Sequence, residues 1–138
     1  MWLDERSEME NPGAGTKGDV ERLLSDLRAL SGEINSCAVL SEEGELISSS
    51  HEPGVERERA SAMLAALSSI AKRTAREHGK DHVSQLRIKT DNGHLLMVRF
   101  DGGGALATTT GPEARVGLAL YDMRNARGGI EQAMGESE

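Results

Sequence analysis

Apolar residues recur every three or four positions near the start of the chain, which is the spacing of one face of an α-helix. Asp19, a favourable N-cap residue, precedes this pattern, and Gly32 follows it. We therefore predict a helix over residues 19–30. Residues 1–18 have little apolar content and no periodicity, so we predict a flexible leader there. The apolar positions of the helix are Val20, Leu23, Leu24, Leu27 and Leu30.

A second helical pattern lies in the middle of the chain, after a predicted hairpin. The hairpin consists of two short apolar segments, 36–40 and 46–48, joined by an acidic turn that contains Gly44. The helix itself is predicted over residues 55–78. Its predicted core face carries Ala60, Met63, Leu64, Leu67, Ile70, Ala71 and Thr74.

Three further strands are predicted after this helix. Residues 83–90 alternate between apolar and polar positions, which indicates a strand with one buried face. Asp91-Asn92-Gly93 favours a tight hairpin turn, because Asn and Gly tolerate the positive φ that such turns require. A strand over residues 95–100 follows, and glycines 102–104 turn the chain into a last strand over 105–110.

A third helix ends the pattern. Pro112 is expected in its first turn, and Val116, Ala119, Leu120, Met123 and Ile130 mark its apolar face. The order α-β-β-α-β-β-β-α predicts a mixed α/β domain of the α+β type, with a five-stranded antiparallel meander sheet. We expect one domain over residues 19–134 and a short tail over 135–138.

The chain resembles the Roadblock (dynein light chain) domain family over residues 19–134. The resemblance rests on the helix VERLLSDLRAL, the hairpin SCAVLSEEGELI, the segment ERASAMLAALSSIA, and the run LRIKTDNGHLLMVRFDGGGALATTT leading into GLALYDMRNA. It implies the Roadblock layout, which is similar to longin and profilin domains. It also implies a non-enzymatic role as a dynein subunit, as a scaffold component for Ras-like GTPases or, in prokaryotes, as a partner of Mgl-type GTPases. Which GTPase is bound, and whether its hydrolysis or its nucleotide exchange changes, is left open.

Composition and charge narrow the classes of function. The net charge of −7 at pH 7 and the presence of only one Trp, one Tyr and one Phe argue against nucleic-acid binding. The sequence has no apolar run long enough to span a bilayer and no apolar core of a secretory signal at its start, so we expect a cytoplasmic protein without membrane insertion. Its single cysteine, Cys37, excludes an internal disulfide.

No set of residues predicts a catalytic, cofactor-binding or metal site. His78 and His82 have the spacing of two metal ligands on a helix, but Gly79 predicts that the helix ends between them. Cys37 lies in an apolar strand without an adjacent base, which is typical of a buried structural thiol. The GxxxxGK[ST] spacing of a phosphate loop is absent from the sequence. We therefore expect a protein that is not an enzyme and needs neither cofactor nor metal.

The family resemblance implies a homodimer in which the helix over 55–78 meets its symmetry mate and the strand over 83–90 pairs across the two-fold axis. The sequence adds a physical reason, because small residues on the side of this helix away from its core face let two helices approach closely. An isologous contact would also cover an otherwise open edge strand. The predicted interface residues are Ala62, Ala65, Ala66, Ser69, Leu86 and Ile88.

Residues 56–80 carry six basic and three acidic side chains, although the whole chain is acidic. Such a strip can steer an acidic partner, but solvated helix faces often have this composition without any partner. Lys72, Arg73 and Arg76 are predicted to project away from the core face, and we expect them to contact the Ras-like GTPase. The alternative is a small-ligand sensory module of PAS-like or profilin-like layout, although few aromatic residues are available to line its pocket.

Overall fold

The computed structural model describes residues 12–43, 45–50, 57–80 and 82–135, which form three helices and five strands. Their order along the chain is the predicted one. Residues 1–11 of the predicted leader and 136–138 of the predicted tail lie outside the described residues. The elements are α2 (Pro12–Leu30), β1 (Ile34–Leu40), β2 (Leu46–Ser50), α3 (Arg57–Glu77), β3 (Gln85–Thr90), β4 (Gly93–Arg99), β5 (Ala105–Thr110) and α4 (Val116–Gly135).

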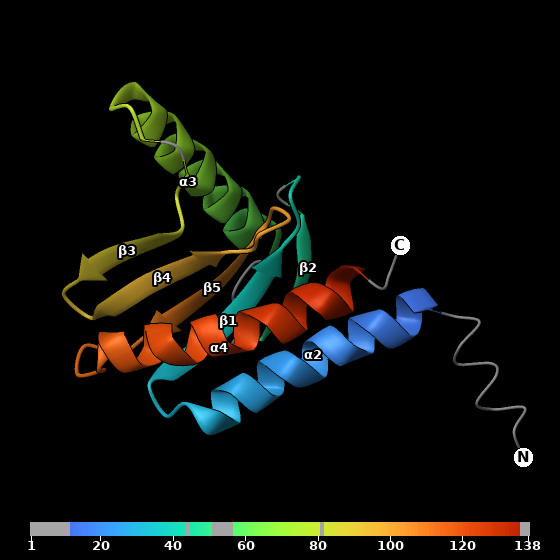
Figure 1. Ribbon diagram of the computed structural model, residues 1–138. Coiled ribbons are helices and arrows are strands. Elements are labelled where there is room, and N and C mark those ends of the chain that lie inside the picture. The colour runs from blue at the N-terminus through green and yellow to red at the C-terminus, as the bar shows by residue number, and fades with distance from the viewer. Residues whose placement is uncertain (1–11, 44, 51–56, 81, 136–138) are drawn as a thin grey trace, which may run out of the picture.

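The five strands form one antiparallel sheet in the order β2-β1-β5-β4-β3 (Figure 1). The predicted α+β class and antiparallel sheet are confirmed, but only β3, β4 and β5 follow one another as a meander. β1 lies beside β5 because α3 carries the chain from the β1–β2 hairpin to the far edge of the sheet. Val39 therefore pairs with Leu106, and Leu106 with Val98, so three strands share one apolar face.

The main core lies between this face of the sheet and the helices α2 and α4 (Figure 1). Of the apolar stripe of α2, Val20, Leu24 and Leu27 are buried as predicted, Leu23 is half-buried, and Leu30 is 74% exposed. Each fully buried large aliphatic side chain contributes about 1.5–3 kcal/mol, so this side of the sheet provides most of the stability. The large buried residues are Val20, Leu24, Leu27, Val39, Leu96, Val98, Phe100, Leu106, Leu120, Met123 and Ile130.

α3 lies on the opposite face of the sheet and buries much less apolar surface (Figure 1). It packs on the sheet mainly through Leu64 and Leu67, which are half-buried. Met63 and Ile70 are 65% and 57% exposed, so their prediction as core residues is wrong. Successive helical residues are about 100° apart, and a narrow contact with the sheet therefore leaves these two side chains outside it.

The start of α2 also differs from the prediction. The helix begins at Pro12 rather than at Asp19, so residues 12–18 of the predicted flexible leader are helical. Proline suits this place, because its fixed φ is helical and the first turn needs no N–H donor. Asp19 is consequently not an N-cap, and its carboxylate instead lies 3.3 Å from the guanidinium of Arg22.

The start of α4 is held by a contact between distant parts of the sequence. Pro112 lies in a turn rather than in the first helical turn as predicted, and the helix begins at Val116. The carboxylate of Glu33 accepts hydrogen bonds from the backbone N–H of Arg115 at 2.6 Å and from its guanidinium at 3.1 Å. These bonds lower the pKa of Glu33 below its ordinary value of 4.5.

The predicted turn at Asp91-Asn92-Gly93 joins β3 to β4. Thr90 pairs with Gly93, so Asp91 and Asn92 form a two-residue loop. The φ of Gly93 is 148°, and a Cβ at this residue would clash with the carbonyl oxygen of Thr110 on β5. Glycine is therefore required here both by its φ and by the close approach of β5.

Candidate functional site

α3 exposes an apolar strip on its outer face, which we call the α3 strip. Met63 and Ile70 lie two helical turns apart on it, and small side chains surround them. A strip of this kind can accept another helix at close distance. Of the small residues predicted at a dimer contact, Ala62 and Ala66 are exposed on this face. Ser69, which is exposed, and Ala65, which is half-buried, line the groove between α3 and the sheet.

β3 forms one edge of the sheet. Among the described strands it pairs with β4 alone, so its outer N–H and C=O groups are free to pair with another strand. Leu86 and Ile88, the predicted interface residues of this strand, are half-buried and lie opposite Met97 and Leu95 of β4. Paired residues share a face of the sheet. The predicted residues of β3 therefore lie on the same side of the molecule as α3.

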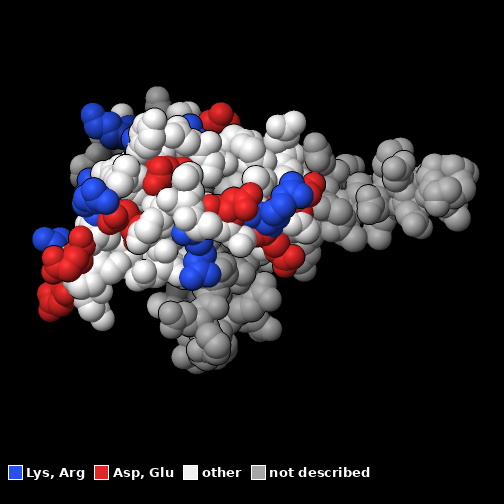
Figure 2. All heavy atoms as spheres, turned by 90° about the horizontal axis from the view of Figure 1, so that it is seen from below, with Lys and Arg blue, Asp and Glu red and all other residues white. Residues whose placement is uncertain are grey.

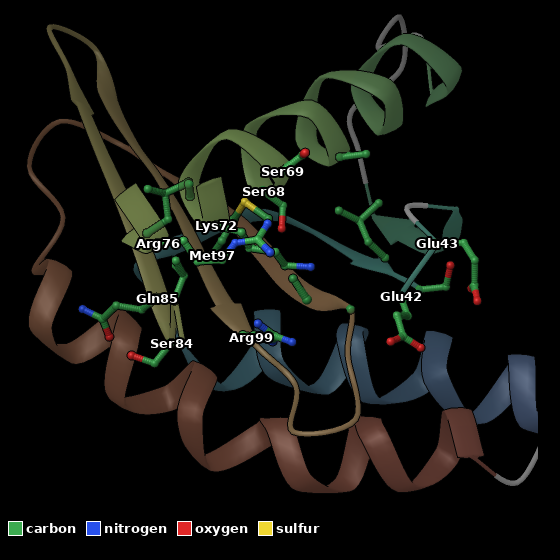
Figure 3. A pocket seen from close by; sticks show the side chains of 18 residues that line it. Glu42, Glu43, Ser68, Ser69, Lys72, Arg76, Ser84, Gln85, Met97 and Arg99 are labelled. Carbon is green, nitrogen blue, oxygen red and sulfur yellow. The ribbon is translucent and has the colours of Figure 1, made fainter. Parts of the chain in front are cut away.

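A groove of about 290 Å³ separates α3 from the sheet (Figure 3). Its floor includes the apolar side chains of Leu86, Met97 and Ala105, one from each of β3, β4 and β5. Glu42 and Glu43, from the turn after β1, lie at one end of the groove. None of the described residues that line it is aromatic.

The structure separates the three cations predicted to share one surface. Lys72 and Arg76 line the groove, and Lys72 is half-buried, whereas Arg73 is exposed and does not line the groove. The reason is helical geometry, because residues four apart share a face and their immediate neighbour is rotated by about 100°. The prediction that all three project away from the core is therefore wrong for Lys72.

Arg99 is a groove residue that the sequence analysis missed. It lies two positions after Met97 on β4, so both side chains face α3, while Val98 between them is buried in the main core (Figure 3). The alternation along β4 indicates that Arg99 and Met97 share one face of the strand. Only the strand order shows that this is the face over which α3 lies.

The single thiol lies in the main core rather than in the groove. The Sγ of Cys37 donates to the carbonyl oxygen of Leu24 at 3.7 Å. Burial raises the pKa of Cys37 to about 11, and the nearby charge of Arg28 opposes this shift. The interpretation of Cys37 as a buried structural thiol agrees with this geometry.

The two histidines with metal-ligand spacing are not on one helix. α3 ends at Glu77, and Gly79, with a φ of 73°, turns the chain before His82. The Nδ1 of His78 lies 2.9 Å from the carbonyl oxygen of Thr74, where it caps the helix end. Within the described residues, no three His, Cys, Asp or Glu side chains are grouped to hold a metal ion.

The surface formed by α2 and α4 carries charges of both signs. Acidic and basic side chains are mixed over the face seen in Figure 2, which views the molecule from below Figure 1. A surface of mixed sign gives little preference for an acidic or a basic partner. None of the described helices is long and apolar enough to cross a bilayer. The α3 strip, the β3 edge and the groove therefore make up the candidate site.

A known protein family matches most of this chain. The family model of the Roadblock/LC7 domain matches residues 20–110. The chain belongs to the Roadblock/LC7 family. The matched residues run from Val20 in α2 to the end of β5, so they include α3, the β3 edge and the strands that line the groove. A comparison with curated protein sequences finds no match.

Solved Roadblock-type structures have the same fold. Myxococcus xanthus MglB superposes with a TM-score of 0.79 at 12% identity, over 88% of this chain and 92% of MglB. An MglB with a tetrameric arrangement gives 0.78 at 9% identity, over 89% and 93%. The Roadblock/LC7 domain from Streptomyces avermitilis gives 0.69 at 24% identity, over 84% and 98%. At these identities the likeness shows the fold of this chain.

Proposed function

We propose that this Roadblock/LC7 protein is a non-enzymatic, homodimeric adaptor of the cytoplasm that binds a Ras-like small GTPase of the Mgl type. It serves as a scaffold or as a regulator of the nucleotide cycle of that GTPase. The observation that carries the proposal is the likeness to MglB over 88% of the chain, together with the Roadblock/LC7 match. The buried thiol of Cys37, with its raised pKa, is unsuited to act as a cysteine nucleophile.

Two exposed features of the same side support the homodimer. The α3 strip presents Met63 and Ile70 to solvent, and β3 leaves one edge unpaired among the described strands. A two-fold contact through α3 and β3 covers both features at once, which removes an aggregation-prone edge. The tetrameric arrangement of one similar MglB is consistent with self-association of the fold.

The GTPase is expected to bind the outer surface of the paired α3 helices, where Arg73 is exposed and Arg76 lies at the groove rim. Lys72 lies deeper and adds charge from inside the groove. We assign none of these cations as an arginine finger, because a rigid helix in a dimer interface is poorly suited to deliver a guanidinium to the γ-phosphate. A change in hydrolysis rate would therefore come from reshaping the GTPase.

The test measures association with small GTPases encoded in the same genome, each purified and loaded with GDP or with a non-hydrolysable GTP analogue. Reversing Arg73 and Arg76 to Glu should slow association with the cognate GTPase by roughly tenfold at low ionic strength and flatten its salt dependence. A matched control reverses Arg22 and Arg124, two exposed cations of α2 and α4, to Glu. It makes the same change in net charge on the other side of the sheet.

Wild-type association rates for the α3 double variant across the salt series would show that this surface is wrongly chosen. If no GTPase binds the wild-type protein in either nucleotide state, the proposed function itself fails.

A further inference from the structure

The groove beneath α3 holds three cations that have no ion-pair partner among the described residues. Lys72 and Arg76 of α3 and Arg99 of β4 line it together (Figure 3). Within the part of the chain that the structure describes, none of these three side chains forms an ion pair or a hydrogen bond. Cations held near one another repel, and a bound anion would relieve that repulsion.

The same groove also has an apolar floor. Met97 and Ala105 are 4% and 5% exposed, and Leu86 packs beside them. A concave site of about 290 Å³ with an apolar floor and a few convergent charges has the usual character of a small-molecule site. Its chemistry selects a ligand that has both an apolar body and an anionic group.

The carboxylates give the groove a direction. Glu42 and Glu43 lie at one end of the groove, and Lys72 and Arg76 lie on its α3 side (Figure 3). They would repel a second anionic group at that end. A ligand with one anionic head therefore has one favoured orientation, with its head at Lys72, Arg76 and Arg99.

We propose that this groove binds a small amphipathic anion, in which a single carboxylate or phosphate head contacts Lys72, Arg76 and Arg99. Ammonium and guanidinium groups form charge-assisted hydrogen bonds with such heads, and the apolar body lies on Met97 and Ala105. This site goes beyond the binding of a GTPase. It can be measured on the protein alone, so it succeeds or fails independently of that partner.

The first experiment titrates the wild-type protein by calorimetry with octyl phosphate and with octanoate, which separate the two head groups. Octanol supplies the apolar body without charge, and inorganic phosphate supplies the head without the body. We expect saturable binding of at least one amphipathic anion, and at least tenfold weaker binding of octanol and inorganic phosphate. Equal binding of octanol would overturn the proposal, as would no binding of either anion.

The second experiment locates the ligand by NMR of methionine methyl groups. The methyl of Met97 in the groove should shift on titration, whereas that of Met123 of α4, which is fully buried in the main core on the other side of the sheet, should not. The double variant Lys72→Met with Arg99→Gln should bind at least tenfold more weakly. Arg73→Gln, on the same helix outside the groove lining, should bind as the wild type does.

Three further results would contradict the site. Unchanged affinity of the double variant would place the ligand elsewhere, and a shift of Met123 without Met97 would do the same even if the variant failed to fold. Binding that appears only in an Ala66→Arg variant, in which the α3 helices are separated, would show that a second copy of the chain fills the groove.

Discussion

The thiol of Cys37 is 1% exposed and has a pKa of about 11, which makes its reactivity a sensitive measure of the folded core. At about pH 8 the thiolate fraction is about a hundredfold lower than that of an ordinary cysteine, and burial slows access further. We predict that a disulfide reagent such as DTNB labels the native protein at least a hundredfold more slowly than the urea-unfolded protein. Comparable rates would show that β1 and α2 do not bury the thiol in solution.

The carboxylate of Glu33 should make the stability depend on pH. Its pKa is lowered in the folded state, chiefly by the hydrogen bond from the Arg115 backbone and then by that from the Arg115 side chain. The stabilisation is therefore present above the ordinary pKa of 4.5 and is lost as the pH falls through the folded value. Glu33→Gln should melt below the wild type at neutral pH, and the difference should disappear in acid.

A neighbouring carboxylate provides the control for this measurement. Glu113 is exposed and belongs to the same turn before α4, so Glu113→Gln should change the melting temperature little at any pH. If the melting temperatures of Glu33→Gln and the wild type differ by the same amount at neutral and acidic pH, the packing of the Glu33 side chain rather than its charge stabilises the start of α4.

At the scale of the element, the sequence predicts helices and strands well where the periodicity of apolar residues arises from burial against a single core. The alternation over β3 and the stripe of α2 each face a single core, so pattern and burial agree except at Leu30. α3 is different, because Met63 and Ile70 fit a helical apolar stripe whether it packs on its own sheet or on another helix. For the same reason the groove, and Arg99 with it, could not be predicted before the strand order was known.

Ala66 tests the role of the α3 strip as a dimer contact. It is exposed between Met63 and Ile70, and an arginine there would place a long charged side chain where two helices must approach closely. Ala66→Arg should shift the protein from dimer to monomer in sedimentation at micromolar concentration. Gln132→Arg, on the exposed side of α4, should remain dimeric, and a wild-type monomer under the same conditions would contradict the homodimer.

At the scale of the whole molecule, the two faces of the sheet are covered unequally. α2 and α4 bury a continuous core, whereas α3 covers the other face in part and keeps its own apolar strip in solvent. An element with few buried apolar contacts opens locally at low free energy. In the proposed homodimer, the packing of α3 is therefore expected to depend on the second copy more than the packing of α2 or α4 does.

This inequality predicts a melting temperature that depends on protein concentration. In the proposed homodimer only folded chains associate, so mass action stabilises the folded state, and a tenfold rise in concentration should raise the melting temperature by roughly 2–4 °C. Ala66→Arg should show no such rise. The α3 amides of this variant should exchange hydrogen faster than those of the wild type. The amides of α2 and α4 should stay better protected from exchange than those of α3. Equal melting temperatures of the wild type over a tenfold concentration range would indicate that α3 is stable on its own sheet, and that the exposed strip of Met63 and Ile70 serves a contact other than self-association.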